Sequence, residues 1–469
     1  MRDNMSSEKI SKKVLGAILA TGIMSFCGVV VETAMNITFP TLMKEFNIDI
    51  ATVQWMTTIY LLVVAIVVPL SAILKKSFKT KNLFLLANLL FLLGVVLDII
   101  APSFSLLLAG RVIQGIGTGI ALPLMFNIIL EQVPRSKIGV MMGVGTLITA
   151  VAPAVGPTFG GIIVTSLNWR YIFIFLLPVL LLSLIIGILT IEQKSELQRF
   201  KLDILSFAFI GLMFTGFILG FSNMGSQNFF SLTVLGAFVV GLIGCISLIL
   251  RSNRLENPII DLRVLKNTTF SGHVIAFFIL QMISLGLSFI LPNYIQLVNG
   301  NSAIIAGMVV LPGAILGAIF APFGGRILDS LGAAKPILLG SVLTLSTLIL
   351  FSLFSLELTN LAIGSIYLGF MAGVGLTFGN IMTNGLKNLK LSEQADGNAI
   401  LNTLQQFAGA AGTSVVSAII AQSQAGGAIQ ISTATGSRNA FIVLFIASII
   451  EFVILLKVVR SSKKSSPSV

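Results

Sequence analysis

Charged residues, cysteine and histidine are scarce in this sequence. Only 10% of its 469 residues are charged, against about 25% in soluble domains, whereas 56% are hydrophobic. This composition excludes a water-soluble globular protein and is typical of a chain built from membrane spans. The two cysteines, Cys27 and Cys245, lie inside apolar runs, and the single histidine, His273, has no metal ligands beside it. The sequence therefore predicts neither a disulfide framework nor a metal site.

Sequence patterns of enzymes are also missing. There is no nucleophile motif, no pair of catalytic carboxylates and no phosphate-binding loop. The glycine-rich stretch GVGLTFG at 373–379 lies within a predicted helix and follows no strand, so it is not a nucleotide loop. We expect no enzymatic activity and no cofactor. The first apolar run lacks a small-residue cleavage site, so we expect no cleavable signal peptide.

Long apolar runs are what the sequence has in abundance. A membrane-spanning helix needs about 20 mostly apolar residues, and fourteen segments meet this requirement. All but four of the 29 lysines and arginines fall on the cytoplasmic side when the N-terminus is placed there, so both termini are predicted to be cytoplasmic. This asymmetry accounts for the net charge of +12, and we expect no nucleic-acid partner. The predicted spans are 14–37, 51–74, 83–101, 106–130, 139–164, 171–191, 203–223, 230–250, 269–292, 303–323, 336–354, 360–384, 397–421 and 440–457.

The fold predicted is an all-α integral membrane protein with six, two and six spans in succession. Charged segments at 192–203 and 251–267 set two spans without strong motifs apart from the six before and the six after them. The domains expected are a cytoplasmic N-terminus (1–13), an N-terminal six-helix bundle (14–191), linkers with two extra helices (192–267), a C-terminal six-helix bundle (268–458) and a cytoplasmic tail (459–469).

Two loops form a weak internal repeat. The loop after the tenth span carries Gly325, Asp329 and Gly332. The loop after the second span aligns with it but has Lys76 and Lys79 in place of the aspartate and the last glycine. Repeated halves around a central site are a common plan for secondary transporters.

Three charged residues lie inside predicted spans of the N-terminal bundle. Glu32 is the only charged residue between Lys13 and Lys44, so its carboxylate must be protonated, paired with a cation or exposed to a wet cavity. Arg111 and Asp98 lie at a similar depth, and we expect Arg111 to pair with Glu32 across a cavity. Burial favours the neutral form of a carboxyl group and a nearby guanidinium favours the ionised form, so the two effects can bring protonation within reach of a proton gradient.

Each of these charges also has a structural interpretation. Arg111 could be a permanent tie between spans, and Asp98 could lie at the membrane interface. For Glu451 in the last span, and for His273 at the cytoplasmic start of the ninth, we favour hydrogen bonding or packing over function.

The fifth span contains the densest motif, which combines glycines with prolines. Glycines four residues apart share one helix face and allow close helix approach, and each proline removes a backbone donor and bends the helix. Generic tight packing is the alternative interpretation. The residues of the motif are Gly143, Pro153, Gly156, Pro157, Gly160 and Gly161.

This motif is similar to the antiporter motif of the major facilitator superfamily. Ala109-Gly110-Arg111-Val112-Ile113-Gln114-Gly115 resembles the arginine motif of the superfamily's fourth span. Val31-Glu32-Thr33-Ala34-Met35-Asn36 resembles the acidic first-span motif of its fourteen-span drug:H⁺ antiporters. The resemblance covers nearly the whole chain and implies export of cationic or lipophilic drugs in exchange for protons.

The sequence departs from the family pattern at several positions. Glu32 stands where the family usually has aspartate, which keeps the carboxylate, and Ala152 replaces a glycine. Lys76 and Lys79 replace an aspartate and a glycine that help hold the outward-open state in the family, which puts this function of the loop in question.

Polar residues within the spans are the candidates for binding substrate. An apolar pocket with few polar groups and one carboxylate suits a lipophilic cation. The alternative for each amide is a hydrogen bond between helices. The candidates are Glu32, Asn36, Tyr60 and Gln114 in the first half and Gln281, Asn380, Asn402 and Gln405 in the second.

The sequence thus predicts a proton-coupled multidrug exporter that works by alternating access. Glu32, tuned by Arg111 and Asp98, is the expected proton site, and the motif glycines and prolines, with Gly325, Asp329 and Gly332, serve the conformational change. Few acids lie in the second half, so we expect monovalent cations as substrates. We expect a monomer in a bacterial cytoplasmic membrane. The rival interpretations are a transporter of another solute, as metabolite exporter or symporter, and a non-transporting membrane receptor.

Overall fold

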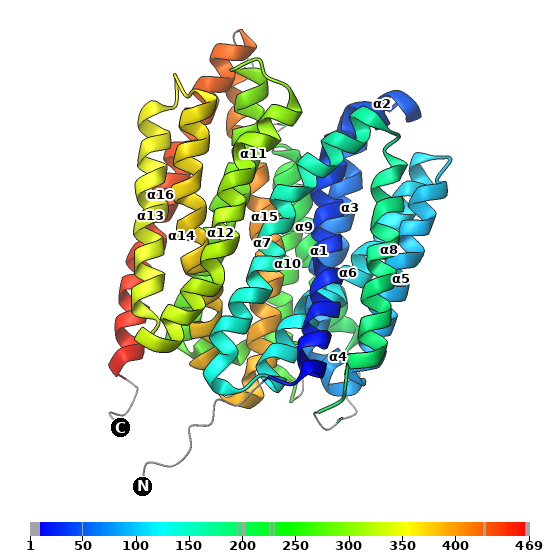
Figure 1. Cartoon of the computed structure of the whole chain (residues 1–469), viewed down its shortest axis with the longest axis vertical. Coiled ribbons are helices and arrows are strands. Elements are labelled where there is room, and N and C mark those ends of the chain that lie inside the picture. Colours follow the sequence, from blue (N-terminus) through cyan, green and yellow to red (C-terminus); the bar gives the residue numbers. More distant parts are fainter. Residues whose placement is uncertain are drawn as a thin grey trace.

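The chain folds into helices that run side by side along one axis (Figure 1). The computed structural model describes residues 10–48, 50–194, 197, 203–224, 227, 230–256, 258–424 and 428–464, and no strand occurs within these ranges. Helices are favoured because each satisfies its own backbone hydrogen bonds in a medium without water. Thirteen of the described helices are long and apolar enough to cross a membrane. The predicted all-α membrane fold is confirmed.

The helices form two groups, with one helix pair packed between and behind them (Figure 1). The N-terminal group contains α1 (Lys12–Ile37), α2 (Phe39–Phe46), α3 (Ile50–Val67), α4 (Ser71–Ser77), α5 (Thr80–Ile100), α6 (Phe104–Gln132), α7 (Ile138–Ser166) and α8 (Arg170–Thr190). The pair is α9 (Ile204–Asn223) and α10 (Leu232–Arg254). The C-terminal group contains α11 (Thr268–Leu297), α12 (Ala303–Leu331), α13 (Ala334–Phe354), α14 (Asn360–Lys387), α15 (Gln394–Gln424) and α16 (Ile429–Lys464).

The second predicted span, 51–74, is not one continuous helix. Helix α3 ends at Val67, a 3₁₀ turn covers Val68–Leu70, and α4 follows from Ser71. The interruption falls at Pro69, which lacks a backbone N–H and cannot continue the helical hydrogen bonds.

Several helices extend beyond their predicted spans. Helix α16 runs over 36 residues, from Ile429 to Lys464, whereas the apolar run predicts only 440–457. It therefore continues into the segment predicted as a cytoplasmic tail. Apolarity marks only the part of a helix that lies in hydrocarbon, and polar ends can continue the helix outside it.

The α9–α10 pair is tied together at one end by an ion pair. Arg251 donates two hydrogen bonds to Asp203, at 2.6 and 2.7 Å. These bonds from the Arg251 guanidinium hold the pKa of Asp203 well below its usual range. Helix α9 packs against α3 of the N-terminal group and α15 of the C-terminal group. On the α15 side, the Phe407 ring lies 5.4 Å from the Phe217 ring, centroid to centroid.

Helix α1 begins and α16 ends at the same end of the molecule, the lower end in Figure 1, which we call the termini end. This placement agrees with the prediction that both termini share one side of the membrane. That this side is the cytoplasm remains a prediction from the distribution of lysine and arginine.

Candidate functional site

Glu32 lies near the end of α1, one helical turn beyond a close contact among three helices. The Tyr60 hydroxyl of α3 donates to the Gly28 carbonyl (3.0 Å) and lies 2.9 Å from the Thr118 hydroxyl of α6. A Cβ atom at Gly28 would come within 2.9 Å of Thr118, so the glycine allows α6 this close to α1. The contact brings Tyr60 to the face of α1 that carries Glu32. The Glu32 side chain is partly accessible.

Arg111 of α6 is fully buried and is held by uncharged groups. Its guanidinium stacks on the Tyr60 ring, 4.1 Å from the ring centre. Its Nε donates to the Met56 carbonyl (3.3 Å), and Nη1 donates to Gln114 Oε1 (2.8 Å). The other terminal nitrogen, Nη2, has no hydrogen-bond partner among the described residues. Arg111 therefore binds to α3 and α6 and still has one terminal NH₂ group without a hydrogen-bond partner among the described residues.

Gln114 connects Arg111 to Asp98. The Gln114 amide nitrogen donates to Asp98 Oδ2 at 2.7 Å, while its oxygen accepts from Arg111. Asp98 is fully buried in α5, two residues before the end of the helix. A Cβ atom at Gly110 would lie only 1.9 Å from Asp98 Oδ1, so glycine is required beside this carboxylate.

The structure brings Glu32, Arg111 and Asp98 together, but in a different arrangement from the one expected. Within the described residues, Glu32 forms no hydrogen bond or ion pair, although Arg111 is near enough to act on it electrostatically. The expected Glu32–Arg111 ion pair is thus absent there, and the guanidinium instead contacts the Tyr60 ring and Gln114. We call Glu32, Tyr60, Asp98, Arg111 and Gln114 the charge cluster.

A cavity lies between the two helix groups. It is lined from α1 and α7 on one side and from α11, α12, α14 and α15 on the other, and its volume is about 90 Å³. None of its described lining residues is charged. Pro153 and Pro157 of the α7 motif form part of the N-terminal wall, and Gln281 and Gln405 contribute amides to the C-terminal wall.

The other predicted substrate residues lie elsewhere. Tyr60 and Gln114 belong to the charge cluster. Asn380 donates to the Leu376 carbonyl within α14, and Asn402 donates to Asn398 within α15. Both amides are buried and already hydrogen-bonded. The side chain of Asn36 lies outside the described part of the chain.

The glycines of the α7 motif face two different neighbours. Gly156 and Gly160 pack on α1: a Cβ at Gly156 would lie 1.9 Å from the Thr33 hydroxyl, and one at Gly160 would lie 2.6 Å from the Ala34 carbonyl. The predicted shared face and close approach are therefore observed. Gly143 faces α12, where a Cβ would lie 2.8 Å from the Ala321 carbonyl. Gly161 lies near the start of α12, with Ile304 at 4.0 Å from a Cβ position.

The two groups are joined at the termini end by hydrogen bonds and ion pairs. Asp329 at the end of α12 accepts from the Val140 N–H at the start of α7 (3.2 Å) and lies 3.4 Å from Lys387 Nζ. Gly325 packs on α7, where a Cβ would lie 2.5 Å from the Gly139 carbonyl, and Gly332 ends α12 with a positive φ of 82°. These residues were predicted to serve the conformational change.

Two further contacts at this end were not predicted from the sequence. Lys76 of α4 pairs with Asp396 in the first turn of α15, at 3.1 Å. Asn398 of α15 donates to Asn127 of α6, at 2.8 Å. Together with Asp329, these side chains join the two helix groups at the termini end.

The remaining titratable side chains within spans are held by hydrogen bonds. The Ser341 hydroxyl of α13 donates to Glu451 of α16 at 2.6 Å. His273 lies with one ring nitrogen 2.7 Å from the Thr269 carbonyl and the other 2.7 Å from the Asn384 amide. Both arrangements fit the structural interpretation. No group of histidines, cysteines and carboxylates suited to a metal occurs in the described residues.

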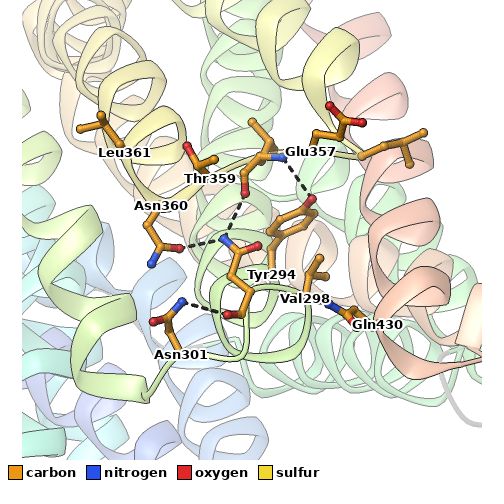
Figure 2. Close-up of a pocket in the computed structure, with 11 residues that line it drawn as sticks. Tyr294, Val298, Asn301, Glu357, Thr359, Asn360, Leu361 and Gln430 are labelled. Atoms are coloured by element: carbon orange, nitrogen blue, oxygen red, sulfur yellow. Dashed lines mark hydrogen bonds between the residues drawn. The ribbon is translucent and has the colours of Figure 1, made fainter.

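A shallow polar hollow lies at the opposite end of the C-terminal group (Figure 2). Asn299 donates to the Leu358 carbonyl (3.0 Å) and to Asn360 Oδ1 (2.8 Å), and Gln430 donates to the Val298 carbonyl (2.7 Å). These amides fasten the ends of α11, α14 and α16 to one another. The hollow therefore has a structural role in holding these helix ends together, and none of its described lining residues belongs to the charge cluster.

Comparison with known proteins agrees with this geometry. Residues 21–413 match the family model of the Major Facilitator Superfamily. The chain is 39% identical to the lincomycin resistance protein LmrB of Bacillus subtilis over 414 residues, covering 88% of this chain and 86% of that protein. It is 26% identical to a multidrug resistance protein B homolog of Mycobacterium tuberculosis, covering 87% of this chain and 76% of the relative.

A solved structure shares the fold. The crystal structure of the human organic anion transporter MFSD10 superimposes with a TM-score of 0.63 at 14% identity, covering 93% of this chain and 99% of the other. At this identity the likeness concerns the fold alone.

Proposed function

The chain belongs to the Major Facilitator Superfamily, and on this premise we propose that it exports drugs in exchange for protons. It is a multi-pass cell-membrane transporter, not an enzyme. The observation that carries the proposal is Glu32, a partly accessible carboxylate placed beside Tyr60 and Arg111 in an otherwise apolar helix. An ionised carboxylate in this position has a high free energy unless it is paired or in contact with water, and such residues usually mark a transport site.

The charge cluster suits the binding of one proton. Arg111 carries one positive charge against two carboxylates, so a single proton on Glu32 or Asp98 makes the cluster neutral. A net charge at a buried site is costly, which favours the neutral state in the absence of a cationic substrate. Asp98 is fully buried and linked to Arg111 through Gln114, whereas Glu32 is partly accessible. We therefore assign proton exchange to Glu32 and the role of counter-charge to Asp98.

The conformation fits one step of alternating access. The contacts of Asp329, Lys76 and Asn398 join the two helix groups at the termini end. With that end in the cytoplasm, as the distribution of lysine and arginine predicts, we assign this conformation to an outward-facing state. Here Glu32 takes up a proton from outside and a bound drug leaves. The close α1–α7 contact at Gly156 and Gly160 keeps these helices together while the groups rock.

The proposed substrates are lipophilic compounds that carry at most one positive charge. The described cavity lining has no charged residue, and with Arg111 ionised the charge cluster can hold at most one net negative charge. One negative charge can balance a monovalent cation. The names of the relatives make lincomycin the first compound to test.

The decisive experiment replaces Glu32 by glutamine, which keeps size and polarity but cannot ionise. In inverted membrane vesicles, we expect Glu32→Gln to lower proton-driven drug uptake at least tenfold, a barrier change of about 1.4 kcal/mol or more. Glu451→Gln is the matched control, because Glu451 is also a carboxyl within a predicted span but lies between α13 and α16, outside the cluster. Its transport rate should stay within about twofold of that of the parent protein, which corresponds to a change of less than about 0.5 kcal/mol in the activation free energy.

Proton release provides a second readout. Adding a substrate to the detergent-solubilised protein should release protons, and Glu32→Gln should not release any. Full transport by the Glu32→Gln variant would refute the assignment of the proton to Glu32. A parent protein that releases no proton with any drug or dye would favour a transporter of another solute.

A further inference from the structure

The C-terminal wall of the cavity presents two glutamine amides without protein partners. Gln281 of α11 and Gln405 of α15 both line the cavity. Neither side chain forms a hydrogen bond within the part of the chain that the structure describes. This sets them apart from Asn380 and Asn402, whose amides are satisfied by their own helices.

The two amides lie at neighbouring depths. The rings of Phe278 and Phe407 meet with their centres 5.7 Å apart, which fixes the register of α11 against α15. Gln281 follows Phe278 by three residues, and Gln405 precedes Phe407 by two. At 1.5 Å per residue in two helices that run in the same direction, the two glutamines are offset by about 7.5 Å along the axis. A single small molecule can reach both.

The rest of the cavity is mainly apolar. Leu285, Met371 and Phe378 are among the side chains that surround the glutamines. A purely apolar ligand would displace water from the two amides and leave their polar atoms unsatisfied, which is unfavourable. A ligand with its own hydrogen-bonding group would replace that water without this loss.

We infer that Gln281 and Gln405 recognise an uncharged hydrogen-bonding group, an amide or a set of hydroxyls, on an amphiphilic substrate. The inference rests on the proposed function and refines its substrate class. The favoured substrate joins a lipophilic body and one basic amine to a neutral polar group. A plain lipophilic amine is accepted but gains nothing from the two glutamines.

Two amines of equal chain length separate these cases. N-(3-dimethylaminopropyl)decanamide carries an amide within its chain, and N,N-dimethyltetradecylamine has the same length without it. Transport is measured in proteoliposomes that contain the full chain and carry a proton gradient. For each compound, the KM is compared between protein variants. Its partitioning into lipid is the same in every variant and therefore does not affect the comparison.

The variants are Gln281→Met and Gln405→Met, which keep side-chain length and helix propensity but remove the amide. We expect each to raise the KM for the decanamide about five- to tenfold, the effect of one lost hydrogen bond, and to change the KM for the tetradecylamine by less than about twofold. Gln281→Ala and Gln405→Ala serve as second variants and should show the same selectivity. Gln430→Met is the control, because Gln430 bonds the Val298 carbonyl in the hollow of Figure 2, outside the cavity.

The outcomes separate this inference from the proposed function. If the parent protein moves both amines with protons but the glutamine variants affect both compounds equally, or neither, the inference is wrong and proton-coupled export stands. If the parent protein moves lincomycin with protons but neither amine, the inference is wrong and the proposed function stands; if it moves none of the three, both fail.

Discussion

Lys76 and Asp396 form an ion pair that joins the N-terminal and C-terminal helix groups at the termini end, with Nζ and Oδ2 3.1 Å apart. Asp396 lies in the first turn of α15, where the helix dipole favours a negative charge. The loop containing Asp329 makes the corresponding contact in the other half, with its carboxylate on the first turn of α7. In the first half, Lys76 stands at the position that corresponds to Asp329, and the carboxylate, Asp396, lies on the helix that it contacts.

Exchanging the charges of Lys76 and Asp396 tests this contact. Lys76→Asp places two carboxylates opposite each other, and like charges at an interface cost several kcal/mol. We expect this substitution to lower the transport rate about tenfold by disfavouring the conformation closed at the termini end, since about 1.4 kcal/mol corresponds to a tenfold change in population. The double variant Lys76→Asp/Asp396→Lys should recover much of the rate.

The recovery will be incomplete, because Asp396 also accepts a hydrogen bond from the Asp261 N–H at 3.3 Å, which lysine cannot accept. Initial rates of drug uptake into inverted vesicles, normalised to the amount of protein, provide the measurement. A double variant no faster than Lys76→Asp alone would show that the pair does not matter for transport.

Gln114→Leu should disrupt the charge cluster. Leucine cannot bridge Arg111 and Asp98, so a buried guanidinium and a buried carboxylate each lose a partner, at about 1–3 kcal/mol for each group. We expect a lower midpoint of thermal unfolding and loss of substrate-driven proton release. Asn88→Leu is the matched control, since Asn88 is also a fully buried amide and bonds Ser183 at 3.2 Å. It should lower the unfolding midpoint but retain proton release. Proton release that survives in Gln114→Leu would exclude Gln114 from coupling.

The Asp203–Arg251 pair predicts a pH-dependent difference between the parent protein and Asp203→Asn. The pKa of Asp203 is lowered in the folded state by its bonds to Arg251, so its stabilising effect is fully present above the unfolded value of about 3.9. It decreases as the pH falls from there toward the folded pKa. Hydrogen exchange at the start of α9 should be faster in Asp203→Asn at pH 7, and the difference in opening free energy should narrow below about pH 4. A difference unchanged down to pH 3 would contradict this origin.

The sequence predicted the helices well, because long apolar runs are a local property that the membrane requires. It also predicted the face shared by Gly156 and Gly160, which follows from helical periodicity alone. The sequence did not predict contacts that depend on how the helices pack against one another. Equal depth suggested that Arg111 pairs with Glu32, but depth does not give the direction in which a side chain points. The structure directs Arg111 to Tyr60 and Gln114.

Contacts between segments that are distant in the chain could not be predicted from the sequence either. Lys76 and Asp396 are 320 residues apart, and no local pattern links them. The replacement of the family's aspartate by Lys76 suggested a missing contact, whereas the structure contains an ion pair in which the carboxylate, Asp396, is supplied by the opposite helix. A search for an acidic residue in the first turn of the matching helix in the other half could have found Asp396.

Gly110 offers the most direct test of the charge cluster, because a Cβ added there would meet Asp98 Oδ1 before any other atom. In Gly110→Ala the new Cβ would lie 1.9 Å from Asp98 Oδ1, a distance that real Cβ contacts do not reach. Asp98 would have to move, and its hydrogen bond with Gln114 would break. We expect a fall of about 2–4 kcal/mol in stability, within the range for overpacking combined with a lost hydrogen bond to a charged group.

Asp98→Ala should relieve this clash, although the cluster then lacks a carboxylate. A Cβ at position 110 would still lie 3.0 Å from the Gly94 carbonyl, so Gly110→Ala should cost less stability in the Asp98→Ala background than in the parent protein, although not zero. Gly211→Ala in α9 is the control, since a Cβ there meets nothing within 4 Å and alanine favours the helix by about 0.5–1 kcal/mol. Thermal unfolding in detergent measures all four variants. If Gly110→Ala is as well tolerated as Gly211→Ala, Asp98 does not occupy the position described here, and its place as the counter-charge of Arg111 is lost.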